Sequence, residues 1–250
     1  MPPIPNVHDA KHKGVLVENL SVSFGGLMAI ADVGMALRRH EIVGLIGPNG
    51  AGKTTFVNCL TGFQQPSGGR IVVDGKSTSA WSAADFRRYG IARTFQAGRL
   101  FSAMTVSENV EVAALGLGAT RRAARALVDD LLGWMRIADK ANLIAGSLAY
   151  SDERRVGIAR ALAMSPSFIL LDEPAAGMSE FECDELMELV VAMPKQFGCG
   201  VLLIEHNMRV VMTICERIVV LDGGRAIAEG TPREIMADQS VISAYLGSTA

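Results

Sequence analysis

The chain has 250 residues, of which 49% are hydrophobic, and its 24 basic and 26 acidic side chains give a formal charge of −2. This length and apolar content favour one large α/β domain with an inserted part, and they argue against disorder. The nearly balanced charge gives no reason to expect nucleic acid as a partner, and no apolar run approaches the roughly 18–20 residues that cross a bilayer.

Residues 1–13 contain three prolines and several charges, and we interpret them as a flexible lead-in to a single domain over residues 14–250. They lack the apolar core of a secretory signal, so we expect the protein to stay in the cytosol unless a partner holds it at a membrane. The four cysteines form no C-x-x-C pair and have no histidine at the spacing of zinc ligands. They are therefore predicted to be buried, reduced thiols.

The first part of the domain reads as strands that alternate with short helices. The predicted elements are antiparallel strands over 14–24 and 27–37 around a turn at Phe24–Gly26, a buried strand over 41–47, a helix from about Gly52, a strand and turn over 68–77, and a helix begun by Ser82.

From residue 96 to about 149 apolar residues recur at helical spacing, which predicts a helical subdomain inserted over about 97–164. A helix is expected over Leu148–Leu162, with Ser151 as its N-cap. After it, three short apolar strands alternate with helices, as in a parallel sheet, and two short helices follow. The strands cover 167–174, 200–207 and 217–224, and the two helices lie within 231–247.

The sequence GPNGAGKTT matches G-x-x-x-x-G-K-[ST] between a predicted strand and a predicted helix. Its glycines let backbone N–H groups close around phosphate oxygens without a Cβ in the way. Lys53 is placed to neutralise the terminal phosphates of ATP, and the Thr54 hydroxyl to ligate Mg²⁺. A glycine turn that binds nothing is the alternative, which the flanking elements disfavour. The predicted ATP-binding residues are Gly47, Pro48, Asn49, Gly50, Ala51, Gly52, Lys53, Thr54 and Thr55.

Polar residues follow two of the predicted parallel strands, at the edge of the sheet where ligands bind. Asp172 is placed to hold Mg²⁺, and Glu173 to polarise a water for attack on the γ-phosphate. An acidic pair in this position is more often part of a solvated turn. The phosphate loop in the same chain makes a role in metal binding and catalysis the favoured interpretation here. His206 follows the next strand and can donate a hydrogen bond to the γ-phosphate.

Five motifs in order resemble those of the ATP-binding subunits of ABC transporters, over nearly the whole chain. They are GPNGAGKTT as Walker A, ARTFQ ending at Gln96 as the Q-loop, FILLDEP as Walker B, AAGMSE as the D-loop, and LLIEHN with His206 as the switch histidine. The resemblance implies an α/β ATP-binding cassette with a P-loop, RecA-like core, an antiparallel β subdomain and an inserted helical subdomain. It also implies that Gln96 acts in catalysis and at Mg²⁺, and that Phe24 lies against adenine.

The start of the helix at Leu148 resembles the family's signature, which faces ATP bound by a second subunit. Ala149 has no hydroxyl to offer the phosphate, a loss of about 1.5–3 kcal/mol for a bond to a charged group, although relatives with proline there also lack it. Ser151 replaces a glycine, so it is either strained or a substitute donor. Ala149, Tyr150 and Ser151 are expected at the ATP of the partner subunit. The departures at Ala149 and Ser151 predict a heterodimer with one weak ATP site; a homodimer, or a fully active subunit that tolerates both changes, is the alternative.

Several segments are most similar to ATP-binding subunits of branched-chain amino acid importers. They are FGGLMAI, GIARTFQAGRLFSAMTVSENV and AIAEGTPREIMADQSVISAYLG. This resemblance implies ATP and Mg²⁺ as cofactors, a second ATP-binding subunit, two membrane permease subunits, an indirect extracytoplasmic solute-binding protein and a place on the cytoplasmic face of the membrane. The insertion between Val110 and Leu127 is shorter than is common in that subgroup, so the docking surface for the permeases is expected to differ.

Related subunits for urea, amides or lipopolysaccharide are the alternatives within the family. A soluble ABC protein that acts on ribosomes or DNA is disfavoured, because this chain has one cassette, a short insertion and slight negative charge. A P-loop kinase for a small molecule would not need the Q-loop, the helical insertion and the switch histidine.

Overall fold

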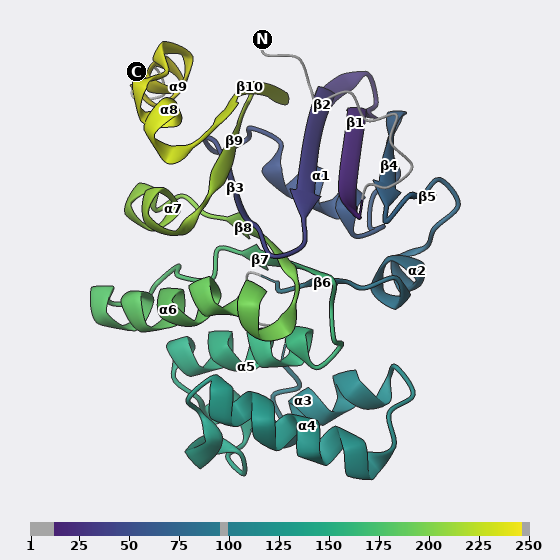
Figure 1. Cartoon of the computed structure of the whole chain (residues 1–250), viewed down its shortest axis with the longest axis vertical. Coiled ribbons are helices and arrows are strands. Elements are labelled where there is room, and N and C mark those ends of the chain that lie inside the picture. Colours follow the sequence, from purple (N-terminus) through teal and green to yellow (C-terminus); the bar gives the residue numbers. More distant parts are fainter. Residues whose placement is uncertain (1–12, 96–99, 247–250) are drawn as a thin grey trace.

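Two β-sheets, nine α-helices and two short 3-10 helices make up the part of the chain that the computed structural model describes, residues 13–95 and 100–246 (Figure 1). A four-stranded antiparallel sheet has the order β2-β1-β4-β5. Its strands are β1 (Gly14–Phe24), β2 (Leu27–Arg38), β4 (Gly68–Val73) and β5 (Lys76–Ser77). The predicted hairpin is confirmed, because Phe24 pairs with Leu27 across the tight turn.

The second sheet has six strands in the order β10-β9-β3-β8-β7-β6, and all its pairs are parallel except β10 with β9. The strands are β3 (Ile42–Ile46), β6 (Ile91–Arg93), β7 (Phe168–Asp172), β8 (Gly200–Ile204), β9 (Arg217–Asp222) and β10 (Arg225–Gly230). The four central strands were predicted from their apolar runs. The edge strands β6 and β10 were not, because β6 is only three residues long and β10 carries no continuous apolar run.

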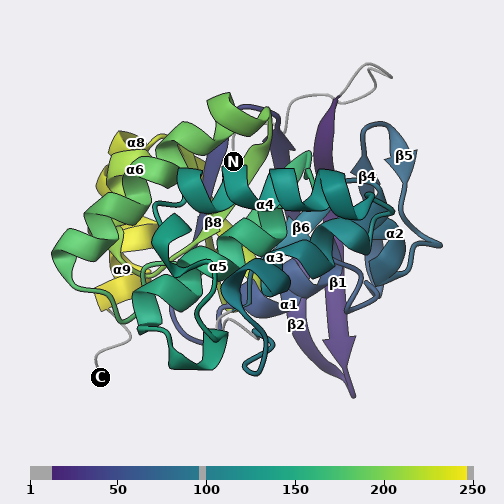
Figure 2. The same ribbon diagram turned by 90° about the horizontal axis from the view of Figure 1, so that it is seen from below.

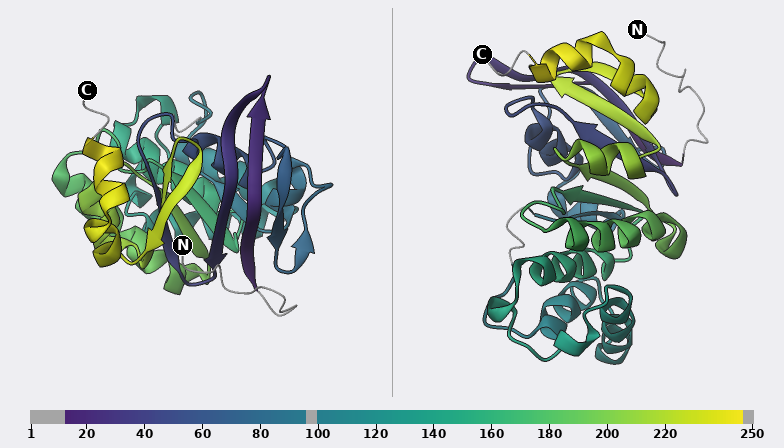
Figure 3. Two further views of the ribbon diagram at one scale, coloured as in Figure 1. Left: turned by 90° about the horizontal axis from the view of Figure 1, so that it is seen from above. Right: turned by 90° about the vertical axis from the view of Figure 1, so that its left-hand side faces the viewer.

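The helices are α1 (Lys53–Leu60), α2 (Ala83–Arg88), α3 (Val106–Leu115), α4 (Arg121–Trp134), α5 (Tyr150–Leu162), α6 (Glu180–Phe197), α7 (Met208–Ile214), α8 (Pro232–Ala237) and α9 (Gln239–Leu246). Helices α3, α4 and α5 pack on one another (Figure 2). Helices α3 and α4 lie at the opposite end of the molecule from α8 and α9 (Figure 3). Ser82 caps α2 as predicted, and α8 and α9 are the two expected short helices.

Two local predictions in the helical part are wrong. The helical spacing expected up to about residue 149 does not form an unbroken helix, because α4 stops at Trp134 and Arg136 takes a left-handed φ of 60°. Ser151 is not the N-cap of α5, since that position is held by Ala149, which offers no side-chain hydrogen bond. Ser151 lies in the first turn and bonds instead to Glu182 of α6, so a tertiary contact outweighs the usual capping preference.

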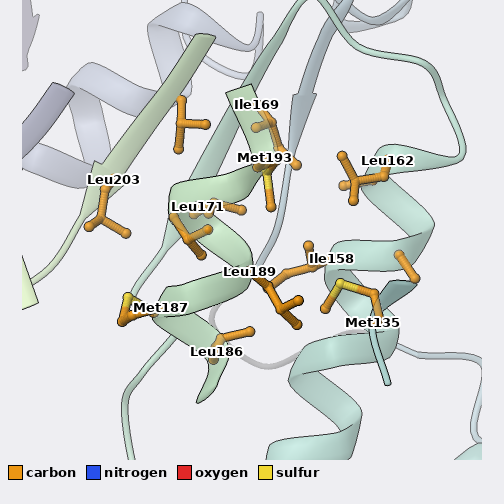
Figure 4. Packing of buried hydrophobic residues seen from close by; sticks show 14 of the residues in the cluster. Met135, Ile158, Leu162, Ile169, Leu171, Leu186, Met187, Leu189, Met193 and Leu203 are labelled. Carbon is orange, nitrogen blue, oxygen red and sulfur yellow. The ribbon is translucent and has the colours of Figure 1, made fainter. Parts of the chain in front are cut away.

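Two apolar cores lie on opposite faces of the six-stranded sheet, because successive strand side chains point in opposite directions. One core joins the sheet to β1, β2 and α1. The other joins it to the helices from α3 to α9, and Figure 4 shows side chains of α5 and α6 packed against Ile169 and Leu171 of β7. These cores fix the ends of β3, β7 and β8, where the polar residues lie.

The four cysteines are free and buried, as predicted. Burial raises the pKa of the Cys59 and Cys199 thiols to about 11. Among residues 13–95 and 100–246, no helix has the length and apolar character to cross a membrane.

Candidate functional site

The glycine-rich loop connects β3 to α1 and has the shape of an anion cradle. Gly47 has a φ of 151°, and a Cβ there would lie 2.0 Å from the carbonyl oxygen of Leu221. Gly52 has a φ of 98°, and a Cβ there would lie 2.6 Å from Cδ1 of Ile30. No side chain caps the first turn of α1, so its N–H groups face the loop opening. The two glycines are thus required because the loop packs closely on Leu221 and Ile30, and the N–H groups at the start of α1, which have no side-chain cap, are the part of the loop suited to bind an anion.

The Lys53 side chain folds back and bonds to the backbone of the glycine-rich loop. Its Nζ donates to the carbonyl oxygens of Gly47 at 2.7 Å and Pro48 at 3.1 Å. Burial lowers the pKa of Lys53 below its ordinary value, and the carboxylates of Glu173 and Asp172 act in the opposite direction. These two acids thus lie close enough to the lysine to influence its pKa.

Asp172 ends β7 and is ion-paired within the protein. Arg93, at the end of β6, places Nη2 2.8 Å from Oδ2 of Asp172 and Nη1 2.6 Å from Oδ1 of Asn58 on α1. The Oγ1 of Thr94 accepts the backbone N–H of Asp172 at 3.1 Å. The strand that leads toward Gln96 therefore holds the acid predicted to bind Mg²⁺. Sequence reasoning missed Arg93, although it lies in the ARTFQ segment, because the three-residue strand that it ends was not predicted.

Replacing Arg93 with methionine is expected to lower the free energy of unfolding by about 3 kcal/mol, because a largely buried carboxylate is left without its cation. In a chain of this size that corresponds to a Tm lower by roughly 6–12 °C. The matched control is Arg209→Met, which breaks an exposed pair of the same 2.8 Å length to Asp184 and is expected to leave the Tm unchanged. Equal shifts in the two variants would contradict a structural role for the buried pair.

Glu173 and His206 follow neighbouring strands and face each other. Nδ1 of His206 lies 3.8 Å from Oε1 of Glu173, and the His206 side chain is 64% exposed. The backbone N–H of Glu173 donates to the carbonyl of Ile204 at 2.8 Å, which joins the two strand ends. The arrangement places an exposed imidazole beside a partly buried carboxylate, on the same edge of the sheet as Lys53.

The remaining predicted ligands around this edge differ in their exposure. Thr54, Asn49 and Gly50 are exposed, whereas Ala51 is buried. Phe24 is half-exposed at the tip of the β1–β2 hairpin, and β2 of that hairpin contacts the loop at Gly52. Gln96 lies outside the described residues.

The start of α5 contacts α6 and the turn after β7. The Tyr150 ring lies so close to Gly177 that a Cβ on the glycine would approach it to 3.1 Å. Arg154 donates to the Tyr150 hydroxyl and to the carbonyl of Phe95, which precedes Gln96. Ser151 has helical backbone geometry, so the strain considered for it is absent. Its hydroxyl bonds to Glu182, whose pKa is held at about 2 chiefly by that bond.

Family models match two parts of the chain. The model described as ABC transporter matches residues 30–176, and the one described as branched-chain amino acid ATP-binding cassette transporter matches residues 227–250. The high-affinity branched-chain amino acid transport ATP-binding protein LivG of Salmonella typhimurium is 44% identical over 92% of this chain and 96% of its own. The lipopolysaccharide export system ATP-binding protein LptB of Haemophilus influenzae is 36% identical over 92% and 95%.

Solved structures that are similar to this chain are also ATP-binding cassettes of ABC transporters. The ADP conformation of an ATP-binding cassette of an ABC transporter is similar with a TM-score of 0.85 and 27% identity, over 94% of this chain and 99% of that one. A dimeric cassette bound to ADP and phosphate after hydrolysis is similar with a TM-score of 0.79 and 25% identity, over 88% and 99%.

Proposed function

The chain belongs to the ABC transporter family and is one of its ATP-hydrolysing subunits, and we propose that it energises the import of branched-chain amino acids. The observation that carries the proposal is the convergence of Lys53, Asp172, Glu173 and His206 at one sheet edge, beside a loop shaped for phosphate. The similarity to LivG over nearly its whole length supports the amino acid substrate.

In this proposal the loop and Lys53 bind the triphosphate. The backbone N–H groups at the start of α1 and the Lys53 ammonium together supply the positive field that the phosphates require. Thr54, Asp172 and Gln96 would hold Mg²⁺, and the exposed Thr54 hydroxyl and the Asp172 carboxylate are the oxygen ligands that this ion prefers. When bound, Mg²⁺ neutralises phosphate charge.

Glu173 is the proposed general base, and it would take a proton from the water that attacks the terminal phosphorus. His206 would donate a hydrogen bond to the same phosphate, and its 3.8 Å approach to Glu173 lets one water touch both groups. Phe24 is proposed to lie against the adenine ring, since its hairpin contacts the phosphate loop.

Two nucleotides would be enclosed between this chain and a second ATP-binding subunit, with the start of α5 facing the nucleotide on the other subunit. Ala149 then offers only its backbone to that phosphate. Because the Ser151 hydroxyl already bonds to the Glu182 carboxylate, this bond competes with any donation to phosphate. We therefore infer a heterodimer in which the site completed by this chain's signature is the weaker one.

Restoring both positions, Ala149→Ser with Ser151→Gly, is expected to raise the ATP turnover of the assembled transporter by about 10–100-fold. The gain comes from one hydrogen bond to a charged phosphate, worth about 1.5–3 kcal/mol. Turnover is measured in the reconstituted complex, and Ala126→Ser on the exposed face of α4 serves as the control. Unchanged turnover in the restored variant would remove the basis for a weak site.

The proposed assembly places the chain on the cytoplasmic face of the membrane, with two permease subunits and an extracytoplasmic solute-binding protein. The test is to purify the native complex through a tag on this chain and reconstitute it in liposomes. Leucine, isoleucine or valine with the binding protein should stimulate ATP turnover several-fold. Stimulation by urea, amides or lipopolysaccharide instead would assign another substrate, and the similarity to LptB makes lipopolysaccharide the first comparison.

A further inference from the structure

Glu205 has a buried carboxylate at the end of β8, and it bonds to two separate turns. The side chain is 1% exposed. Its Oε1 accepts the backbone N–H of Ala175 at 2.9 Å, and its Oε2 accepts those of His206 at 3.2 Å and Asn207 at 3.4 Å. One carboxylate oxygen thus accepts a hydrogen bond from the turn after β7, and the other accepts hydrogen bonds from the turn after β8.

The turn after β7 has an unfavourable backbone that needs such support. Glu173 has a φ of 47°, in the left-handed region that residues other than glycine rarely adopt. It also precedes Pro174, and a following proline favours extended backbone with negative φ at the preceding residue, which Glu173 does not adopt. Such a conformation persists only where neighbouring bonds fix it. Here those bonds flank it, from Glu173 N–H to Ile204 and from Ala175 N–H to Glu205.

The surroundings of Glu205 strengthen these bonds. The carboxylate lies near the buried thiol of Cys215, whose pKa is raised to about 12 chiefly by burial and in part by this charge. Hydrogen bonds to an ionised group gain strength in such low-dielectric surroundings, and an unpaired group there is costly. The hydrogen bonds of Glu205 therefore hold the turns after β7 and β8 in fixed positions relative to each other.

We propose that Glu205 is a positioning residue for ATP hydrolysis, whose two carboxylate oxygens fix Glu173 and His206 relative to each other. The inference rests on the proposed roles of those two residues. It assigns Glu205 no contact with the nucleotide.

The first test is Glu205→Gln, which keeps the size of the side chain but turns one acceptor oxygen into an amide that faces an N–H donor. We expect the kcat for ATP to fall at least roughly tenfold, while the affinity for ATP stays within about twofold because the phosphate loop is untouched. The matched control is Glu41→Gln, a buried glutamate that accepts the Arg38 N–H and pairs with Arg217 far from Glu173. It should lower the Tm and leave kcat unchanged.

The second test is a double-mutant cycle with His206→Ala. If Glu205 acts by placing the two residues together, the combined loss of kcat is smaller than the product of the single losses. Losses that multiply, with His206→Ala itself impaired, would overturn the role of Glu205. Wild-type turnover in His206→Ala would instead overturn the proposed role of His206.

If Glu205→Gln does not fold, hydrogen exchange in the unmodified protein still tests the role of Glu205. The amide hydrogen of Ala175 should exchange slowly, since it is bonded to a buried carboxylate. Exchange at the rate of an exposed loop amide would overturn the inference.

Discussion

Replacing Glu173 with glutamine is expected to reduce ATP turnover by about 10²–10⁴-fold and to leave ATP binding within about twofold of wild type. An amide of the same shape cannot take a proton from the attacking water, and general-base catalysis has this typical magnitude. The phosphate loop and Lys53 are unchanged, so binding should persist. The measurement is steady-state turnover together with equilibrium binding of ATP.

The control is Glu188→Gln, which makes the same chemical change on an exposed glutamate in the middle of α6, outside every motif named above. It should leave turnover at the wild-type rate. Undiminished hydrolysis in Glu173→Gln would show that another group activates the water.

Replacing Lys53 with methionine is expected to weaken ATP binding by about 10–100-fold, since a charge-assisted bond to phosphate is worth roughly 1.5–3 kcal/mol. Methionine keeps much of the length but also gives up the bonds to the carbonyls of Gly47 and Pro48. Equilibrium binding of ATP is the readout. Lys195→Met, on an exposed part of α6, is the control and should bind ATP normally.

The same lysine gives binding a pH dependence of known sign. Burial lowers the pKa of Lys53, and only its protonated form attracts phosphate. Affinity should therefore fall as the pH rises through this lowered pKa, at a lower pH than for an ordinary lysine. Wild-type affinity in Lys53→Met at every pH would contradict the assignment.

Features set by local sequence were predictable. The phosphate loop depends on glycines and a lysine within nine residues, and its flanking strand and helix follow from short apolar runs. The hairpin at Phe24 and the cap at Ser82 were predictable for the same reason, because each is decided by neighbours along the chain.

Features set by distant partners were not predictable. Arg93 and Asp172 are 79 positions apart, and Glu205 and Ala175 are 30 positions apart, so no local sequence pattern predicts either contact. Ser151 was placed wrongly as an N-cap because its bond to Glu182 depends on how α5 and α6 pack. The edge strand β6 was missed for a similar reason: three residues become a strand only beside β7.

A crystal structure of the Glu173→Gln variant with ATP and Mg²⁺ tests most directly whether this edge of the sheet binds and cleaves a triphosphate. The β- and γ-phosphates should lie within hydrogen-bond distance of Lys53 Nζ and the loop N–H groups, with His206 and the substituted side chain at position 173 beside the terminal phosphorus. Phosphates bound elsewhere, or position 173 turned away from the terminal phosphorus, would contradict the account.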